Sequence, residues 1–486
     1  MCIRDSPNLV RAPCQTACPA NVDVPGFIAL IGAKRSAEAL RLHRERNPFA
    51  AVCARVCFHT CEDKCRRGLV DEALSIHGMK RFMVDEEVTM QHPEVRPNET
   101  NARRKVAIIG AGPAGLSCAY FLARLGYRPQ VFEAESRPGG MPVQTIPAYR
   151  LPREILSLEV RMIERMGVII ETNRRLGSDF TLRSLREQGF EAVFLGVGAP
   201  AGVHLGVPGE DVKGVDDAIR FLREYNIRGS APSGRDVVVV GGGNAAIDTA
   251  RTAVRLGARS VTVLYRRTRD EMPAYAEEVE EAEHEGVAIK VLTAPVEIMA
   301  SDGRVCGVKC QVMTLGEFDR SGRRRPRAAA EEPFVIAADQ VITAIGQKLD
   351  AGEILDGLPV ALNKDGFIAV DPHNGRTSLD WLYSGGDAAL GPASVVEAVA
   401  GGERAAVAID AQLTGAEHAF WRQEKECDVG FDPNAEPVKY PRAKMGLLPV
   451  ERRRNNFNEV EQPWTEVVAV AVSRRCLRCD YREKCS

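Results

Sequence analysis

The sequence predicts an α/β protein in which two three-layer domains, each built around a parallel sheet, follow a small all-α domain. Two strand–turn–helix units with glycine-rich turns begin near residues 105 and 236, and six cysteines crowd residues 14–65. The chain has 486 residues, which exceeds the size at which one hydrophobic core keeps growing, so several domains are expected.

The composition excludes several classes of protein. A hydrophobic share of 45% and a charged share of 27% are typical of soluble globular proteins. No apolar run approaches the length of a membrane span, so we expect none. A net charge of -2 lacks the basic excess of a nucleic-acid-binding protein, and the basic stretch 321–327 is interpreted as a solvated loop. The start of the sequence shows no apolar secretory segment, and we expect a cytoplasmic protein.

The cysteine pattern indicates metal or cluster ligation. Without a secretory segment, a disulfide framework is not expected. Structural zinc sites and iron–sulfur clusters both take four thiolates, and a proline often follows one cluster cysteine, as Pro19 follows Cys18. The spacing favours iron–sulfur ligation and leaves zinc open. The apolar residues between the cysteine groups recur at helical spacing, which predicts a helical domain over residues 1–103.

The first glycine-rich unit predicts a Rossmann-like FAD domain. An apolar strand over residues 105–109 leads into Gly110, Gly112 and Gly115, and Glu133 ends the next strand. Such glycines allow a tight turn and a close backbone approach, a helix N-terminus meets the pyrophosphate, and the acid accepts hydrogen bonds from a ribose.

The second unit predicts an NADPH domain. A strand over residues 236–240 precedes a turn whose residues are Gly241, Gly243, Asn244 and Ala246. Its second strand ends in Arg266 and Arg267, where the first unit has an acid. Two guanidinium groups suit the 2′-phosphate of NADP, whereas a free ribose favours a carboxylate. The alternative is that both arginines are surface charges that close a strand.

Two later motifs predict that the chain returns to the flavin domain. The stretch "QVITAIGQ", which contains Gly346, is similar to a returning strand. The stretch "WLYSGGDAALGPASVVEAVAGGERAA" is similar to the strand, turn and helix that close a flavin site, with Gly386 and Asp387 at the turn. We therefore expect a discontinuous FAD domain over residues 104–204 and 335–415, with an NADPH domain over residues 205–334 inserted in it.

This order of domains resembles the small (beta) subunit of glutamate synthase and the N-terminal half of dihydropyrimidine dehydrogenase. The stretch "RPGGMPVQTIPAYRLPREIL" is similar to the family's flavin loop and places Gly140, Met141 and Arg150 at matching positions. The stretch "YRRTRDEMPA" is similar to its NADPH loop, and the resemblance covers about residues 12–412. It implies an NADPH-dependent FAD and iron–sulfur oxidoreductase with two four-iron four-sulfur (4Fe-4S) clusters.

The last segment, residues 416–486, supplies cysteines that the N-terminal pattern lacks. The family's cysteine pattern opens with a C-x-x-C pair that does not precede Cys14 here, and "AVAVSRRCLRCDYREKC" is similar to that opening element. We expect an extended tail that folds back onto the iron–sulfur domain. The resemblance then implies two ligand sets, which are Cys14, Cys65, Cys476 and Cys479 for the first cluster and Cys18, Cys53, Cys57 and Cys61 for the second.

Two details of these ligand sets depend on departures from the family. The family's fourth ligand to the second cluster is often Gln or Glu, and Met79 and Lys80 stand there in this chain, so Cys53 is the candidate. Cys485 receives no role.

Such a protein would convert two-electron into one-electron transfer. Hydride transfer to a flavin needs stacked rings more than an acid or a base, so no catalytic side chain is expected. The predicted partner is an electron-accepting subunit, either the glutamate synthase large subunit or another redox enzyme. A flavin-dependent thiol–disulfide reductase that uses Cys476 and Cys479, and a zinc-bound scaffold, are the alternatives.

Overall fold

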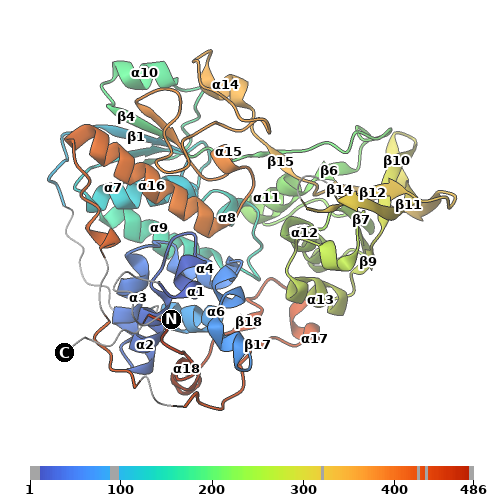
Figure 1. Ribbon diagram of the computed structural model, residues 1–486. Helices are drawn as coiled ribbons and strands as arrows, with labels where there is room; N and C mark the ends of the chain where they lie inside the picture. The colour runs from blue at the N-terminus through green and yellow to red at the C-terminus, as the bar shows by residue number, and fades with distance from the viewer. Residues whose placement is uncertain (1–10, 88–97, 319–321, 424–426, 433–435, 481–486) are drawn as a thin grey trace.

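The computed structural model contains a helical N-terminal domain, two α/β domains and a long C-terminal tail (Figure 1). The structure describes residues 11–87, 98–318, 322–423, 427–432 and 436–480. The predicted α/β class, with a small all-α domain before two parallel sheets, is confirmed.

The N-terminal domain consists of short helices around an apolar interior. Its helices are α1 (Pro13–Thr16), α2 (Val24–Gly32), α3 (Ser36–Arg44), α4 (Ala50–Val56), α5 (Thr60–Asp63), the 3₁₀ helix η2 (Arg66–Leu69) and α6 (Ile76–Glu87). The Asp23 carboxylate accepts a hydrogen bond from the Gly26 N–H at 2.9 Å and caps α2. Phe27, Phe49 and Phe82 are buried in the interior.

The first α/β domain has a five-stranded parallel sheet. Its strands, in spatial order, are β16 (Leu382–Ser384), β4 (Ala192–Leu195), β1 (Val106–Ile109), β2 (Gln130–Phe132) and β3 (Ile169–Glu171). Its helices are α7 (Pro113–Arg124), α8 (Met141–Gln144), α9 (Arg153–Arg165), α10 (Leu182–Glu187), α14 (Ala351–Leu355), α15 (Asp387–Leu390) and α16 (Val395–Thr414). The strands are apolar on both faces because helices cover both sides of a parallel sheet.

The second α/β domain has its own parallel sheet and an antiparallel extension. The parallel strands, in spatial order, are β6 (Val215–Asp217), β14 (Gln340–Thr343), β7 (Asp236–Val240), β8 (Ser260–Leu264) and β9 (Ala288–Lys290). The helices are α11 (Ala218–Arg228), α12 (Asn244–Arg255), η3 (Arg269–Glu271) and α13 (Ala276–His284). The extension, at the right of Figure 1, consists of β10 (Thr293–Ser301), β11 (Arg304–Phe318), β12 (Arg324–Ala328) and β13 (Phe334–Ala337).

The expected boundary at residue 335 is wrong. The strand in "QVITAIGQ" is β14, which pairs in parallel with β7, Val341 opposite Val238, and with β6. The chain crosses back only afterwards, where β15 (Gln347–Lys348) pairs with β5 (Ala201–Gly202). A short apolar strand fits the interior of either sheet, so its residues alone do not reveal which sheet it joins.

The predicted loop over residues 321–327 is also partly wrong, because Arg324–Ala328 forms strand β12. This strand pairs with β11, with Thr314 opposite Arg327.

The tail runs over the helical domain and reaches the second α/β domain. Its elements are η4 (Phe420–Arg422), β17 (Gly446–Leu447), α17 (Val450–Arg453), β18 (Glu461–Gln462) and α18 (Glu466–Ser473). Figure 1 shows α17 beside α13 and α18 against the helical domain, where it packs on α2 and α6. None of the helices in the described residues is both long and apolar enough to cross a membrane.

Candidate functional site

Four cysteines from both ends of the chain meet at one pocket. Cys14, Cys65, Cys476 and Cys479 line it together with apolar side chains that include Leu74 and Ile76. Burial, followed by the neighbouring thiols, raises the pKa of the Cys14 thiol, and burial raises that of Cys476 to about 12. The tail pair therefore lies beside Cys14 and Cys65, the N-terminal cysteines with which the family resemblance grouped it.

Buried arginines hold the tail pair in place. The Arg475 side chain is buried and donates hydrogen bonds to the Asp71 carboxylate at 2.9 Å and to the Glu72 carbonyl at 2.7 Å. Arg67 donates in turn to the Arg475 carbonyl at 3.3 Å. The backbone next to Cys476 is thus tied to the turn that follows Cys65.

The other four cysteines form a second group around α4 and α5. Cys53 lies on α4, Cys57 caps the C-terminus of α4, and Cys61 lies on α5. His59 adopts a left-handed conformation with φ of 53°, which turns the chain sharply between the two helices. Cys18 acts electrostatically on Cys61, and burial raises the pKa of both thiols.

A lysine lies among this second group. Lys80 on α6 is buried, and its Nζ donates a hydrogen bond to the Cys53 carbonyl at 3.1 Å. Burial would lower its pKa, but the nearby thiols raise it above its usual value.

The two cysteine groups are neighbours in the helical domain. Cys61 of the second group also acts electrostatically on Cys14 of the first. Eight thiols match in number the donor set of two 4Fe-4S clusters, and ligation would replace the thiol protons.

The glycine turn of the first domain forms a close backbone cradle. Gly112 caps the N-terminus of α7, and a Cβ on Gly140 would lie only 2.7 Å from the Gly112 Cα. Gly110 and Gly115 are in similarly close contact, since a Cβ on Gly115 would lie 2.0 Å from the Gly110 carbonyl oxygen. The turn is thus packed backbone against backbone at the N-terminus of α7, which is the construction that lets a nucleotide phosphate approach a helix N-terminus.

Two carboxylates border this cradle. Glu133 accepts hydrogen bonds from the backbone N–H groups of Ala111 at 2.7 Å and Glu135 at 2.8 Å, and burial raises its pKa. Asp387 accepts one from the Ala393 N–H at 3.1 Å, and burial raises its pKa to about 6. Gly386 lies against the start of α7, since a Cβ atom added to Gly386 would be 2.8 Å from the Ala114 Cβ. Met141 begins α8 directly after Gly140.

The second glycine turn has the same construction. Gly243 caps α12, Ala246 is buried inside that helix, and Gly241 lies so close to the Ala344 carbonyl that a Cβ would be 2.3 Å from its oxygen. Asn244 accepts a hydrogen bond from the Tyr275 N–H at 3.1 Å. Gly346 has φ of 141° in the segment that leaves the sheet.

The two arginines that follow β8 differ in their exposure to solvent. Arg266 is exposed, whereas Arg267 is buried and its Nε donates to the Arg324 carbonyl on β12 at 2.9 Å. Arg266 is thus the exposed member of the pair, and the Nε of Arg267 is held by β12.

Arg150 lies in an ionic network between the two α/β domains. Its guanidinium contacts the Asp248 carboxylate at 2.8 Å and the Glu278 carboxylate at 3.3 Å. The neighbouring Tyr149 ring lies under Arg251 and Arg255, whose guanidinium carbons are 4.7 and 3.9 Å from its centroid. The sequence offered no sign of these partners, because they lie about 100 residues away.

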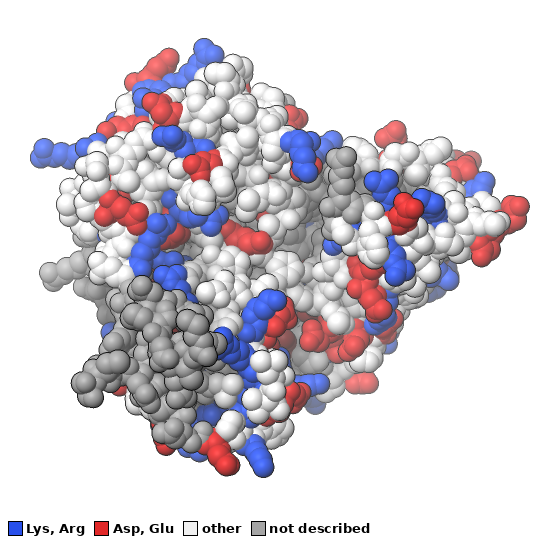
Figure 2. Space-filling view, viewed as in Figure 1, with Lys and Arg blue, Asp and Glu red and all other residues white. Residues whose placement is uncertain are grey.

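A cavity beside this network is lined by residues of the helical domain, both α/β domains and the tail. Its lining residues include Cys57 and His59 of the helical domain, Tyr149 and Arg150 of the first α/β domain, Tyr275 and Glu278 of the second, and Arg442 and Glu461 of the tail. Figure 2 shows acidic and basic side chains gathered on the face where the helical domain meets the second α/β domain. Cys57 of the second thiol group therefore borders a polar junction.

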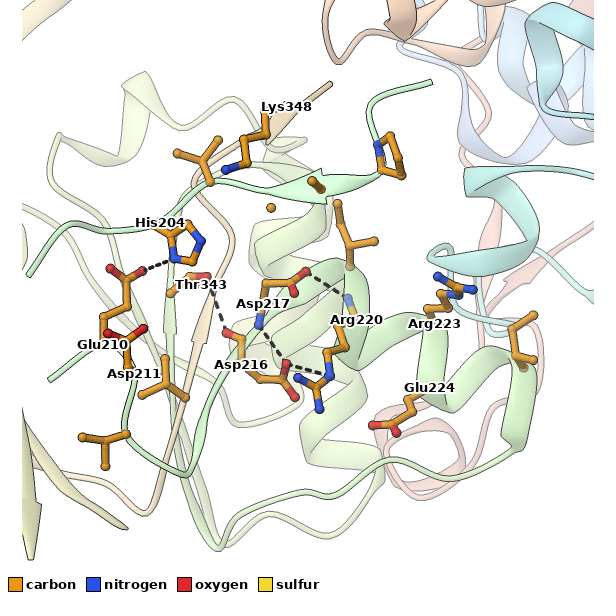
Figure 3. Close-up of a pocket in the computed structure, with 18 of the residues that line it drawn as sticks. His204, Glu210, Asp211, Asp216, Asp217, Arg220, Arg223, Glu224, Thr343 and Lys348 are labelled. Atoms are coloured by element: carbon orange, nitrogen blue, oxygen red, sulfur yellow. Dashed lines mark hydrogen bonds and ion pairs between the residues drawn. The ribbon is translucent and has the colours of Figure 1, made fainter. Parts of the chain in front are cut away.

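A second, larger cleft follows the carboxyl ends of β6 and β14 (Figure 3). The Asp217 side chain accepts a hydrogen bond from the Arg220 N–H at 3.0 Å and caps α11, and Asp216 contacts the Arg220 side chain at 3.5 Å. This edge of an open parallel sheet is where such folds bind nucleotides.

The sequence matches two family models. Residues 104–402 match the model described as pyridine nucleotide-disulphide oxidoreductase, and residues 8–92 match the one described as dihydropyrimidine dehydrogenase domain II, 4Fe-4S cluster.

Similar proteins come from several organisms. The chain is 43% identical to the NADP(+)-dependent formate dehydrogenase subunit beta of Moorella thermoacetica over 97% of this chain and 71% of that subunit. It is 34% identical to the glutamate synthase [NADPH] small chain of Escherichia coli over 81% of this chain and 87% of that chain. The fold is similar to that of Mycobacterium tuberculosis FprA in complex with NADPH, with a TM-score of 0.56 and 20% identity over 66% of this chain and 85% of that one.

Proposed function

Because this chain belongs to the pyridine nucleotide-disulphide oxidoreductases, among the NADPH-dependent FAD and iron–sulfur oxidoreductase subunits, we propose that it passes electrons from NADPH through FAD to two 4Fe-4S clusters and on to a partner subunit. The resemblance to the glutamate synthase small subunit and to dihydropyrimidine dehydrogenase is confirmed by these matches.

Each cofactor has its own set of residues in this proposal. The cradle of Gly110, Gly112, Gly115 and Gly140 would hold the FAD pyrophosphate at the N-terminus of α7. The turn at Gly241 and Gly243 would hold NADPH, with Arg266 on its 2′-phosphate. Cys14, Cys65, Cys476 and Cys479 would bind the first cluster, and Cys18, Cys53, Cys57 and Cys61 the second.

The chain itself supplies positions and no acid or base. FAD held at the cradle of the first α/β domain would supply uptake of a hydride from the nicotinamide and release of single electrons. The glycine turns let the two nucleotides approach the backbone closely, and the ionic network around Arg150 joins the two nucleotide domains. Cys57 lines the cavity at that junction, so the second thiol group borders the nucleotide domains.

The observation that carries the proposal is the position of the tail pair. Cys476 and Cys479 lie beside Cys14 and Cys65, which are more than 400 residues away in the chain, and complete a group of four thiols. A disulfide reductase would need that pair next to the flavin, and the pair lies instead in the helical domain.

The test is the iron content of protein purified without oxygen. Two clusters of four require about eight irons per chain and an EPR signal after reduction by NADPH. Replacing Cys476 and Cys479 by Ser should reduce the iron to about four. The matched control is Cys427→Ser, since Cys427 is a partly buried tail cysteine outside both groups.

Two results would contradict the proposal. Unchanged iron in the double variant would exclude the tail pair as ligands. Flavin without iron in the unaltered protein would instead indicate the thiol–disulfide reductase.

The partner subunit is a finer part of the proposal. Three of the relatives are named as a beta subunit or a small chain, and these names imply a partner subunit for the present chain as well. The formate dehydrogenase alignment covers 97% of this chain and so extends through most of the tail, whereas the glutamate synthase alignment covers 81%. We therefore favour a redox enzyme other than the glutamate synthase large subunit, and co-purification of the native complex would identify it.

A further inference from the structure

Lys80 is a buried cation on α6, with 5% of the residue exposed. Its Nζ donates a hydrogen bond to the neutral Cys53 carbonyl at 3.1 Å. The main charged or titratable groups that act on it are the thiols of Cys18, Cys53, Cys57 and Cys61. No ion pair joins Lys80 to an acidic side chain in the part of the chain that the structure describes.

The surrounding histidines cannot supply a negative charge. His43 and His77 are buried near Lys80, and an imidazole side chain is either neutral or positively charged, so neither residue adds an anion.

The other buried cations of the helical domain are paired. Arg55 contacts Asp85 at 2.8 Å and Glu459 at 2.7 Å, and Arg81 contacts Glu459 at 2.8 Å. An unpaired buried charge is strongly destabilising, so a lone ammonium needs an anion next to it. A cluster held by four thiolates carries a net negative charge and would provide that anion.

Resting on the cluster assignment above, we propose that Lys80 is the counter-cation of the second cluster, with Cys53 as its fourth ligand, and raises the reduction potential of that cluster. An ammonium group has three donors and no lone pair, so Lys80 cannot itself bind iron in this state. Because Lys80 stands where the family often has a ligand, a cluster here would need its fourth ligand from elsewhere, and Cys53 on α4 can supply it.

The effect on the potential follows from charge alone. Reduction of a bound cluster would add one electron, which reduced flavin would lose, and the charge beside Lys80 would become more negative by one unit. A fixed positive charge in a medium of low effective dielectric constant stabilises the more negative state more strongly. Removal of the charge should therefore make the cluster harder to reduce.

The test is an EPR-monitored redox titration of the holoprotein with iron analysis. Lys80→Met should retain about eight irons but shift the oxidised-to-reduced ratio of one cluster at least tenfold at a given potential, which is about 59 mV for a one-electron couple. Lys80→Gln should behave like Lys80→Met, because its amide can still donate to the Cys53 carbonyl but carries no charge. Lys80→Arg should stay near the original potential.

The controls separate this inference from the proposed function. Lys34→Met removes an exposed lysine of the same domain, which pairs with Glu466, and should leave both potentials unchanged. In the Cys476→Ser and Cys479→Ser background, Lys80→Met should shift the cluster that remains.

Several outcomes would overturn the role of Lys80. The first is an unchanged reduction potential in Lys80→Met and Lys80→Gln proteins that keep their iron. The second is the loss of about four irons in both Lys80→Arg and Lys80→Met, because this loss would indicate that Lys80 itself binds iron. An iron-free unaltered protein would overturn the proposed function and this inference with it.

Discussion

Replacing Glu159 by Ala should loosen the contact between the first α/β domain and the helix that carries Cys53. Glu159 on α9 is buried, and its carboxylate accepts hydrogen bonds from the N–H groups of Ala51 at 2.6 Å and Val52 at 3.2 Å, at the start of α4. Each buried donor left without a partner costs about 1–3 kcal/mol, so the loss of both should cost about 2–6 kcal/mol.

Hydrogen–deuterium exchange of the peptide that contains Ala51 and Val52 measures this directly. A cost of about 2 kcal/mol corresponds to an increase of roughly 25-fold in exchange rate. Glu154→Ala is the matched control, because Glu154 is an exposed residue of the same helix and should change stability by less than about 0.5 kcal/mol. Equal exchange in the original protein and the Glu159→Ala variant would refute the capping role of Glu159.

Three further predictions follow from particular charges. Burial raises the pKa of Glu159 from 4.5 to about 7. Its contribution to stability is therefore present below about pH 4.5 and is lost as the pH rises through about 7. In thermal unfolding, the stability advantage of the original protein over Glu159→Gln should shrink across that pH range. Arg266→Ala should raise the Kd for NADPH at least about tenfold and leave that for NADH unchanged, and an equal loss for both would contradict a 2′-phosphate contact. Glu285→Gln should lower the free energy of unfolding by about 3–5 kcal/mol, because it leaves the buried Arg251 and Arg255 without their shared carboxylate. Glu283→Gln, which removes an exposed carboxylate paired with Arg269, should cost about 1 kcal/mol or less.

The parts of the molecule that the sequence predicted well are those set by local patterns. Each glycine turn lies between a buried strand and a helix, and the spacing of those residues alone defines the unit. The grouping of Cys476 and Cys479 with Cys14 and Cys65 came from the family resemblance and from the number of ligands that two clusters need, because no local signal joins the ends of a chain.

The parts that the sequence left open depend on contacts between distant residues. Strand β14 has the same apolar character as a strand of the first sheet, so its place next to β7 could not be read from it. Arg267 looks like Arg266 in the sequence, but the β12 strand uses its Nε. In the sequence Lys80 stands out only as a residue that does not match the family's ligand, and the role proposed for it rests on its burial and on the four thiols that act on it.

The three domains are joined by two different kinds of contact, and both bear on electron transfer. One continuous apolar core includes Val52 of α4, Phe121 of α7 and Val472 of the tail, so the helical domain and the first α/β domain are fixed to each other. The second α/β domain has a separate core and is joined through ion pairs such as Arg150–Asp248.

The tail adds an aromatic stack and an ion pair to the contacts of the second α/β domain. Phe457 stacks on Tyr225 of α11 with centroids 4.1 Å apart, and Arg453 contacts Glu285 at 3.2 Å. Electron transfer from flavin to a cluster needs a constant spacing, which the apolar core between the helical domain and the first α/β domain provides. The ion pairs at the second boundary are buried, so separating them would leave charges without partners, and they too resist a change in the position of the second α/β domain.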